Sequence, residues 1–162
     1  FTSKSILMSL TKINSLEDAV SMVKTWQQSG FNVVFTNGVF DVLHVGHLRY
    51  LNASKALGDK LIIALNSDES VKKLKGDNRP INTLADRMEL IAGFEPVDLV
   101  ISFEEETPFN VINALIPDVI TKGGDYTPDT VVGADIVTEN GGEVIIINFE
   151  EGYSSTSIIE KL

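Results

Sequence analysis

The chain has 162 residues, of which 43% are hydrophobic and 22% charged, and its formal net charge at pH 7 is −10. This composition is ordinary for one globular domain with a full core, and so acidic a chain is a poor candidate for binding nucleic acid or an anionic membrane. The absence of cysteine excludes disulfides and thiolate metal sites and suits a reducing cytoplasm. No apolar run approaches the roughly 20 residues that cross a bilayer. We therefore expect a cytoplasmic protein without nucleic-acid or membrane partners.

The first predicted element is a helix over residues 16–28. Ala19 and Val23 recur at helical spacing, Ser15 can cap the first turn, and Gly30 ends the pattern. We expect residues 1–14 to be an extension or linker and residues 15–162 to form a single domain.

Five short runs rich in valine, isoleucine and leucine are expected to be strands. They are residues 31–35, 60–66, 98–103, 117–122 and 143–148. Helical stretches are expected between and after them, over residues 48–57, around 84–91, from 108, over 132–139 and over the last eight residues. Because most runs are apolar on both faces, the pattern is typical of parallel strands covered on each side. The fold class that we expect is α/β, a doubly wound, Rossmann-like three-layer sandwich with a five-stranded parallel sheet.

The loop after the first predicted strand, residues 36–47, contains both histidines of the chain, His44 and His47, with Gly46 between them. A strand that runs through a loop into a helix start is where α/β proteins hold phosphate. Imidazoles there can donate to phosphate oxygens, and glycine lets the backbone come close. A zinc site would need further histidines or cysteines, which the chain lacks.

Three further segments follow predicted strands or open predicted helices, where ligand contacts are expected. The lysines from Lys72 to Lys75, with Arg79, form a basic cluster, which taken alone is more typical of a solvated helix face. Lys122 precedes two glycines at the end of a strand. The hydroxyls at residues 154–156 can cap a helix and also contact phosphate, because the capping hydroxyls and the free amides of the first turn point in the same direction.

The run from 36 to 47 resembles the His-x-Gly-His signature of the nucleotidyltransferase superfamily. The resemblance covers nearly all of residues 15–162 and is closest in pattern to one branch, the adenylyltransferase domain of ADP-heptose synthases. The other motifs that carry it are Asn66-Ser67-Asp68, Lys72 to Lys75, Gly76-Asp77-Asn78-Arg79-Pro80-Ile81, Asp86-Arg87, Lys122-Gly123-Gly124-Asp125-Tyr126, Val131-Val132-Gly133-Ala134 and Gly152-Tyr153-Ser154-Ser155-Thr156.

The resemblance implies an enzyme that transfers AMP from ATP to D-glycero-β-D-manno-heptose 1-phosphate, giving ADP-heptose and pyrophosphate for lipopolysaccharide core synthesis. It implies Mg²⁺ as the partner of ATP, held mainly by phosphates and water, so that no protein ligand for the metal is expected. In many relatives a sugar kinase domain precedes this one, so a kinase domain or a separate kinase is an expected partner. The apolar segment at residues 6–10 favours a homo-oligomer.

The resemblance also assigns roles to individual residues. The expected catalytic residues are His44, His47 and Lys75. The expected nucleotide- and phosphate-binding residues are Asn37, Gly38, Val39, Phe40, Gly46, Lys122, Gly123, Gly124, Asp125, Ser154, Ser155 and Thr156. The expected substrate-binding residues are Asp41, Asn66, Asp68, Lys72, Arg79 and Arg87.

Other functions remain open on the sequence alone. A cytidylyltransferase for glycerol phosphate or a related alcohol phosphate shares the signature, but such enzymes tend to carry an arginine where this chain has Phe149-Glu150-Glu151, and they lack a lysine equivalent to Lys122. An adenylyltransferase that makes a cofactor such as FAD is disfavoured by the segment from Gly76 to Ile81. A nucleotide-binding module without activity is disfavoured by the intact histidines.

Overall fold

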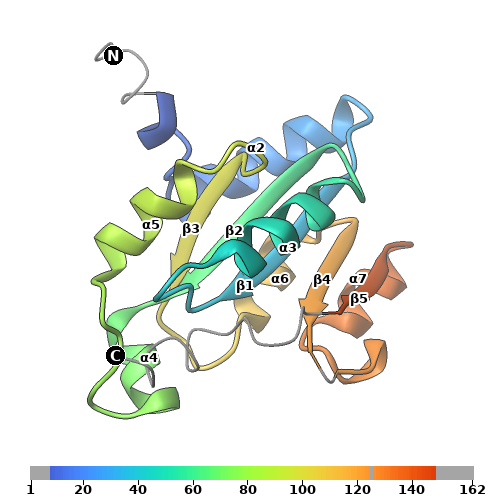
Figure 1. The fold of residues 1–162 in the computed structure, drawn as a ribbon. Helices are drawn as coiled ribbons and strands as arrows, with labels where there is room; N and C mark the ends of the chain where they lie inside the picture. The colour runs from blue at the N-terminus through green and yellow to red at the C-terminus, as the bar shows by residue number, and fades with distance from the viewer. Residues whose placement is uncertain (1–7, 125, 149–162) are drawn as a thin grey trace.

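Five parallel strands form the central layer of the computed structural model, which describes residues 8–124 and 126–148. Their order across the sheet is β3-β2-β1-β4-β5 (Figure 1). The strands are β1 (Val33–Gly38), β2 (Lys60–Asn66), β3 (Leu99–Phe103), β4 (Val119–Gly123) and β5 (Glu143–Ile147). The predicted fold class, a five-stranded parallel α/β sandwich, is confirmed.

Helices cover both faces of this sheet. They are α2 (Leu16–Gln28), α3 (Val45–Lys55), α4 (Asp68–Lys75), α5 (Leu84–Ala92), α6 (Phe109–Leu115) and α7 (Ala134–Glu139), with a 3₁₀ turn η1 (Pro128–Thr130) before α7. One core packs α2, α6 and α7 against the sheet, and the other packs α3 and α5 against the opposite face. Successive strand residues alternate between these cores: Phe35 belongs to the first and Val34 to the second.

Side-chain caps mark the first residue of two of the predicted helices. The helix over Leu16–Gln28 has the predicted limits, and the Ser15 side chain accepts a hydrogen bond from the Asp18 amide. By contrast, α3 begins three residues earlier than predicted because His44 caps it. The helix predicted over the last eight residues lies outside the part that the structure describes.

The described end of the predicted N-terminal extension lies along the edge of the sheet. Ile13 forms a parallel bridge with Val100 of β3, and the Asn14 amide donates to the Val100 carbonyl at 3.0 Å. The Lys12 side chain donates to the Phe94 carbonyl at 3.2 Å. These contacts cover backbone groups that an edge strand would otherwise expose.

The sheet changes direction of winding at β1, which lies between β2 and β4. β1 pairs with β2 along its whole length, up to Gly38 with Leu65. It pairs with β4 only through Val34 and Phe35. The carboxyl ends of β1 and β4 therefore border a crevice at the topological switch point, where α/β sheets bind their ligands.

Candidate functional site

A pocket of about 240 Å³ lies at the carboxyl ends of β1 and β4, against the first turns of α3. Its lining residues are Asn37, Gly38, Val39, Phe40, His47, Tyr50, Lys122 and Gly123. The fold thus brings together two loops that are more than 80 residues apart in the chain. Sequence reasoning named all of these residues except Tyr50. The signal that could have found Tyr50 is its position three residues after His47, on the same side of the helix.

The two histidines form the N-terminal cap of α3. Nδ1 of His44 accepts from the Gly46 amide at 3.1 Å, and Nδ1 of His47 accepts from the His44 amide at 3.2 Å. The ring centroids are 4.0 Å apart. Because each Nδ1 is an acceptor, a neutral ring must carry its proton on Nε2. The cap therefore selects Nε2–H as the donor of both imidazoles, beside the amides of a helix N-terminus.

Both imidazoles are neutral near pH 7. Burial, and to a smaller extent the neighbouring His44, lower the pKa of His47 to about 4. Burial also lowers the pKa of His44. Each neutral ring consequently offers an Nε2–H rather than a positive charge, and the positive potential comes from the helix terminus and from Lys122.

The loop after β1 has a constrained backbone. Phe40 adopts a φ of 50°, and its ring packs 5.6 Å from the ring of His47, measured between centroids. A Cβ atom on Gly38 would lie 2.9 Å from Cε2 of Phe40, which is too close for any side chain. Glycine at 38 therefore allows the Phe40 ring to close over the loop and to support the His47 ring.

Lys122 brings a cation to the opposite wall of the pocket. It is the penultimate residue of β4, and its Nζ lies 5.2 Å from the ring centroid of Tyr126. Burial lowers the pKa of Lys122. A partly desolvated ammonium interacts more strongly with an anion than an exposed one does, because less solvent screens it. Gly123 and Gly124 follow, with Gly124 at a φ of 90°, whereas Asp125 lies outside the described residues.

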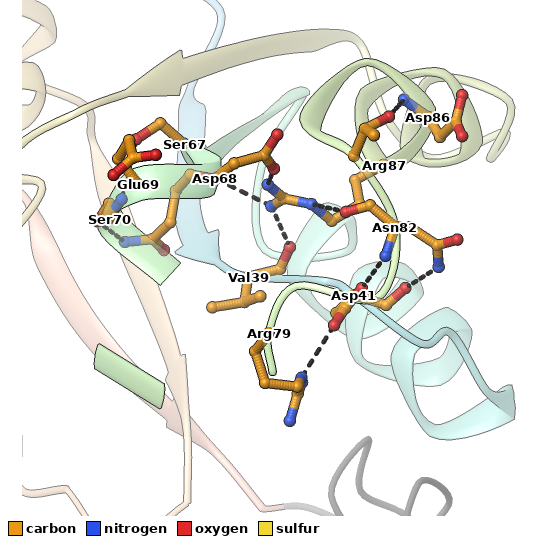
Figure 2. Close-up of polar contacts among 12 residues, drawn as sticks. Val39, Asp41, Ser67, Asp68, Glu69, Ser70, Arg79, Asn82, Asp86 and Arg87 are labelled. Carbon is orange, nitrogen blue, oxygen red and sulfur yellow. Dashed lines mark hydrogen bonds and ion pairs between the residues drawn. The ribbon is translucent and has the colours of Figure 1, made fainter. Parts of the chain in front are cut away.

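Asp41 anchors the segment that leads into α5, as Figure 2 shows. Its side chain is fully buried and accepts from the Ile81 amide at 2.7 Å, the Asn82 amide at 2.8 Å and Nε of Arg79 at 2.9 Å. Burial alone would raise the pKa of Asp41, but the two amides and the Arg79 guanidinium outweigh it, so the pKa is lowered. The structure thus places Asp41 as a brace of the loop rather than in the pocket lining.

Arg87 ties the same loop to β2 and α4 from inside the protein (Figure 2). It is fully buried, and its Nη1 donates to the carbonyls of Val39 and Asn66, both at 2.9 Å. Nη2 donates to Asp68 at 2.7 Å, and Nε donates to the Asn82 carbonyl at 3.0 Å. Arg87 was expected to bind substrate; the structure places it behind the pocket loop, where it donates to the Val39 carbonyl.

The remaining predicted residues lie around the pocket or outside the described part. Asn66 is buried and donates to Ser70, while Lys72 pairs with Glu69 at 3.7 Å on the exposed side of α4. Lys75, in the last turn of α4, is exposed. The structure does not bring the two lysines into the pocket lining. The residues Ser154, Ser155 and Thr156 are outside the described ranges.

Two absences apply to the described residues. Within 8–124 and 126–148, no group of three or more histidine, cysteine, aspartate or glutamate side chains is placed to hold a metal ion. In the same part of the chain, every helix is too short or too polar to traverse a bilayer.

Comparisons with known proteins show the family to which the chain belongs. The sequence profile of the cytidylyltransferase-like family matches residues 35–161. The chain is 53% identical over 147 residues to a protein named "Bifunctional protein HldE" from Marinomonas sp. (strain MWYL1), and 55% identical over 147 residues to the protein of that name from Hydrogenovibrio crunogenus. The alignments cover 91% and 90% of this chain but 31% of each relative. The chain therefore spans about a third of the length of these relatives.

Solved structures extend the comparison. A lipopolysaccharide core biosynthesis protein from Thermoplasma volcanium GSS1 is 30% identical, with a TM-score of 0.58, over 77% of this chain and 100% of that one. A pantoate-beta-alanine ligase from Francisella tularensis has a TM-score of 0.62 over 93% of this chain and 72% of that one. At 12% identity the second likeness concerns the fold alone.

Proposed function

The chain belongs to the cytidylyltransferase-like family of nucleotidyltransferases, and we propose that it transfers AMP from ATP to D-glycero-β-D-manno-heptose 1-phosphate, giving ADP-heptose and pyrophosphate. The relatives named HldE and the lipopolysaccharide core biosynthesis protein support this choice of acceptor. The observation that carries the proposal is the pocket itself, in which His47 and the N-terminus of α3 face Lys122 across the ends of β1 and β4.

The reaction asks mainly for positioning and charge stabilisation. A phosphate oxygen of the acceptor attacks the α-phosphorus, the new P–O bond forms in line, and the bond to the bridging oxygen breaks to release pyrophosphate. The acceptor phosphate is already anionic at neutral pH, so no side chain has to act as nucleophile. In this proposal, Nε2–H of His44 and His47 donates to the phosphate chain where negative charge increases, and Lys122 neutralises part of that charge.

The residues outside the pocket lining complete the proposal. Lys75 and Arg79 would bind the acceptor phosphate, with Lys72, Asn66 and Asp68 nearby in sequence. The hydroxyls of Ser154, Ser155 and Thr156, with Asp125, would contact the nucleotide. Asp41 and Arg87 act through the loop that they hold.

Magnesium is proposed to enter with ATP. Mg²⁺ keeps several waters and binds substrate phosphates through few protein ligands. The donor set of the pocket fits this, since amides, an imidazole N–H and an ammonium are partners for phosphate oxygens, whereas Mg²⁺ prefers oxygen ligands. When bound, the ion would neutralise charge on the pyrophosphate that leaves.

The extent of the chain bears on its partners. Since this chain matches 31% of its bifunctional relatives, we propose that a sugar kinase, as another domain or as a separate protein, supplies the phosphorylated acceptor. We also propose a cytoplasmic location, where ATP is available, and a homo-oligomer.

The test is a substrate panel scored by pyrophosphate release. Four nucleoside triphosphates are paired with heptose 1-phosphate and with glycerol 3-phosphate, with and without a chelator. We expect release only with ATP, heptose 1-phosphate and Mg²⁺. Release with CTP and glycerol 3-phosphate would establish the cytidylyltransferase alternative, and ATP binding without any release would reduce the chain to a binding module. Full rates in excess chelator would remove magnesium from the scheme.

A further inference from the structure

The strands on either side of the pocket separate before they end. The ladder between β1 and β4 stops at Phe35 and Ile120. Each strand nevertheless stays paired to its outer neighbour, as far as Gly38 in β1 and Gly123 in β4. The crevice is therefore local to this pair of strands, and something other than backbone pairing must set its width.

Four buried hydroxyl groups occupy the place where the backbone pairing stops. Oγ1 of Thr36 donates to the carbonyl of Thr121 at 3.1 Å, so a side chain binds a carbonyl just past the last paired residues of the ladder. The hydroxyl of Tyr50 lies 2.8 Å from Oγ1 of Thr36 and 3.2 Å from Oγ1 of Thr121. Oγ of Ser54 lies 2.9 Å from Oγ1 of Thr121. All four residues are buried.

The protons of this cluster can be arranged in only one order if all four hydrogen bonds form. Each hydroxyl has one proton to donate. Since Thr36 donates to the carbonyl, Tyr50 must donate to Thr36, Thr121 must donate to Tyr50, and Ser54 must donate to Thr121. The chain of donors runs from Ser54 in α3 to β4, returns to α3 at Tyr50, and continues through β1 to the Thr121 carbonyl of β4. In the part of the chain that the structure describes, no buried side-chain nitrogen or oxygen lacks a partner.

Tyr50 is the member that connects this cluster to the pocket. Its bonding partners, Thr36 and Thr121, directly precede Asn37 and Lys122, the first pocket residues of the two loops. Tyr50 itself lines the pocket and lies one helical turn after His47 in α3. One phenol hydroxyl therefore joins the three elements that carry the pocket's polar groups.

We propose that Tyr50 is a positioning residue that fixes the width of the crevice between β1 and β4 and the distance of both loops from the first turn of α3. The inference deepens the proposed function, on which its kinetic part rests. Small displacements of groups that orient a reacting phosphate reduce rates strongly, because the reacting atoms must be in line. Tyr50→Phe keeps the ring and its packing but removes the bond from α3 to Thr36 of β1 and one of the two bonds from α3 to Thr121 of β4, leaving that of Ser54.

The test combines a readout that needs no ligand with one that does. Hydrogen exchange is measured on the unliganded protein for Tyr50→Phe and for Val23→Ala, a core truncation on the opposite face of the sheet. Each variant is measured at the same number of degrees below its own melting temperature. We expect faster exchange in Tyr50→Phe at residues 36–40 and 121–124 only, together with a kcat/KM about 10- to 100-fold lower and a weaker Kd for ATP. Val23→Ala should change neither kcat/KM nor the Kd for ATP.

The Thr36 position provides a second pair in case Tyr50→Phe does not fold. Thr36→Ser keeps the hydroxyl and should retain the wild-type exchange pattern. Thr36→Val should show the faster loop exchange and the lower kcat/KM that are expected of Tyr50→Phe. Exchange in the two loops that matches Val23→Ala would overturn the inference, as would unchanged ATP affinity beside wild-type kcat/KM. A wild-type protein that binds no ATP, beside variants that loosen both loops, would overturn the proposed function and leave the positioning role of Tyr50 supported.

Discussion

The guanidinium of Arg87 and the carbonyl of Val39 meet in the protein interior, 2.9 Å apart and 48 residues distant in the chain. This bond fixes the middle of the pocket loop from behind, while the same side chain reaches the end of β2 and the start of α4. A stability defect and a loss of function are therefore expected to coincide at this residue.

Arg87→Lys is predicted to destabilise the fold by about 3 kcal/mol, because a lysine cannot reach four acceptors and leaves buried oxygens without donors. Urea unfolding measures the change. Arg49→Lys, the same substitution at an exposed position of α3, should stay within about 0.5 kcal/mol. Equal effects at the two sites would contradict the bracing role.

His47→Ala is predicted to lower turnover by about 10²–10³, because it removes a donor to the phosphate chain. The loss of the bond from the His44 amide should cost only about 1 kcal/mol of stability. Leu48→Ala, one residue further along α3 and partly exposed, is the control and should keep its turnover. The measurement is pyrophosphate release beside thermal unfolding, and near-normal turnover in His47→Ala would refute the role.

The stability of the protein is predicted to fall as the pH is lowered from about 6.5 to about 4. Burial, with a smaller contribution from His44, lowers the pKa of His47 from its ordinary value of 6.5 to about 4, so the unfolded chain binds more protons than the folded chain in this range. His44 acts in the same direction, and Asp41 adds to the loss only below its ordinary value of 3.8. Urea unfolding across this range should show a shallower pH dependence for His47→Gln. An identical dependence in the variant would assign the effect to other groups.

Lys75→Ala is predicted to raise the KM for a phosphate substrate by about tenfold, as expected for the loss of one charge-assisted hydrogen bond, with little effect on unfolding. Lys73→Ala removes the same charge from the same helix and is the matched control. Both lysines are exposed, so a difference between the variants reports on ligand contact rather than on packing. Unchanged KM values for both substrates would exclude Lys75 from the site.

Removal of residues 8–14 is predicted to destabilise the domain by about 2–3 kcal/mol, since it uncovers the edge of β3 and breaks backbone hydrogen bonds at Val100. The comparison is between chains that begin at Met8 and at Ser15, by urea unfolding. Equal stability would mean that this segment is a linker, as the sequence suggested.

The sequence predicted those parts of the site in which residue type alone carries the chemistry. Two histidines around a glycine, after an apolar strand, indicated the helix start, and the lysine before Gly123 indicated a ligand contact at the end of a strand. Asp41 and Arg87 were grouped with substrate-binding residues because a charge next to a motif does not reveal which way its side chain points. Their burial depends on the packing of α5 and of residues 76–83 against the loop, which is tertiary information.

Tyr50 was missed for the complementary reason. An aromatic residue in an amphipathic helix is most often core, and Tyr50 does pack in the core that contains α3 and α5. Its hydroxyl becomes informative only when Thr36 and Thr121, 85 residues apart, are known to meet it. No local pattern in the chain reports such a meeting.

The bonds that tie the pocket loop to residues 79–82 through Asp41, and to α5 through Arg87, are complete in the unliganded protein (Figure 2). A loop held in this way loses little conformational entropy when a ligand binds, so the binding free energy does not have to offset the cost of ordering the loop. Discrimination between similar ligands must then come from how well each fits a rigid pocket, and closure of the loop over the substrate contributes little. A changed substrate preference should therefore be sought by substitutions that enlarge or shrink the pocket at its lining residues. Substitutions of the residues that hold the loop would only loosen it.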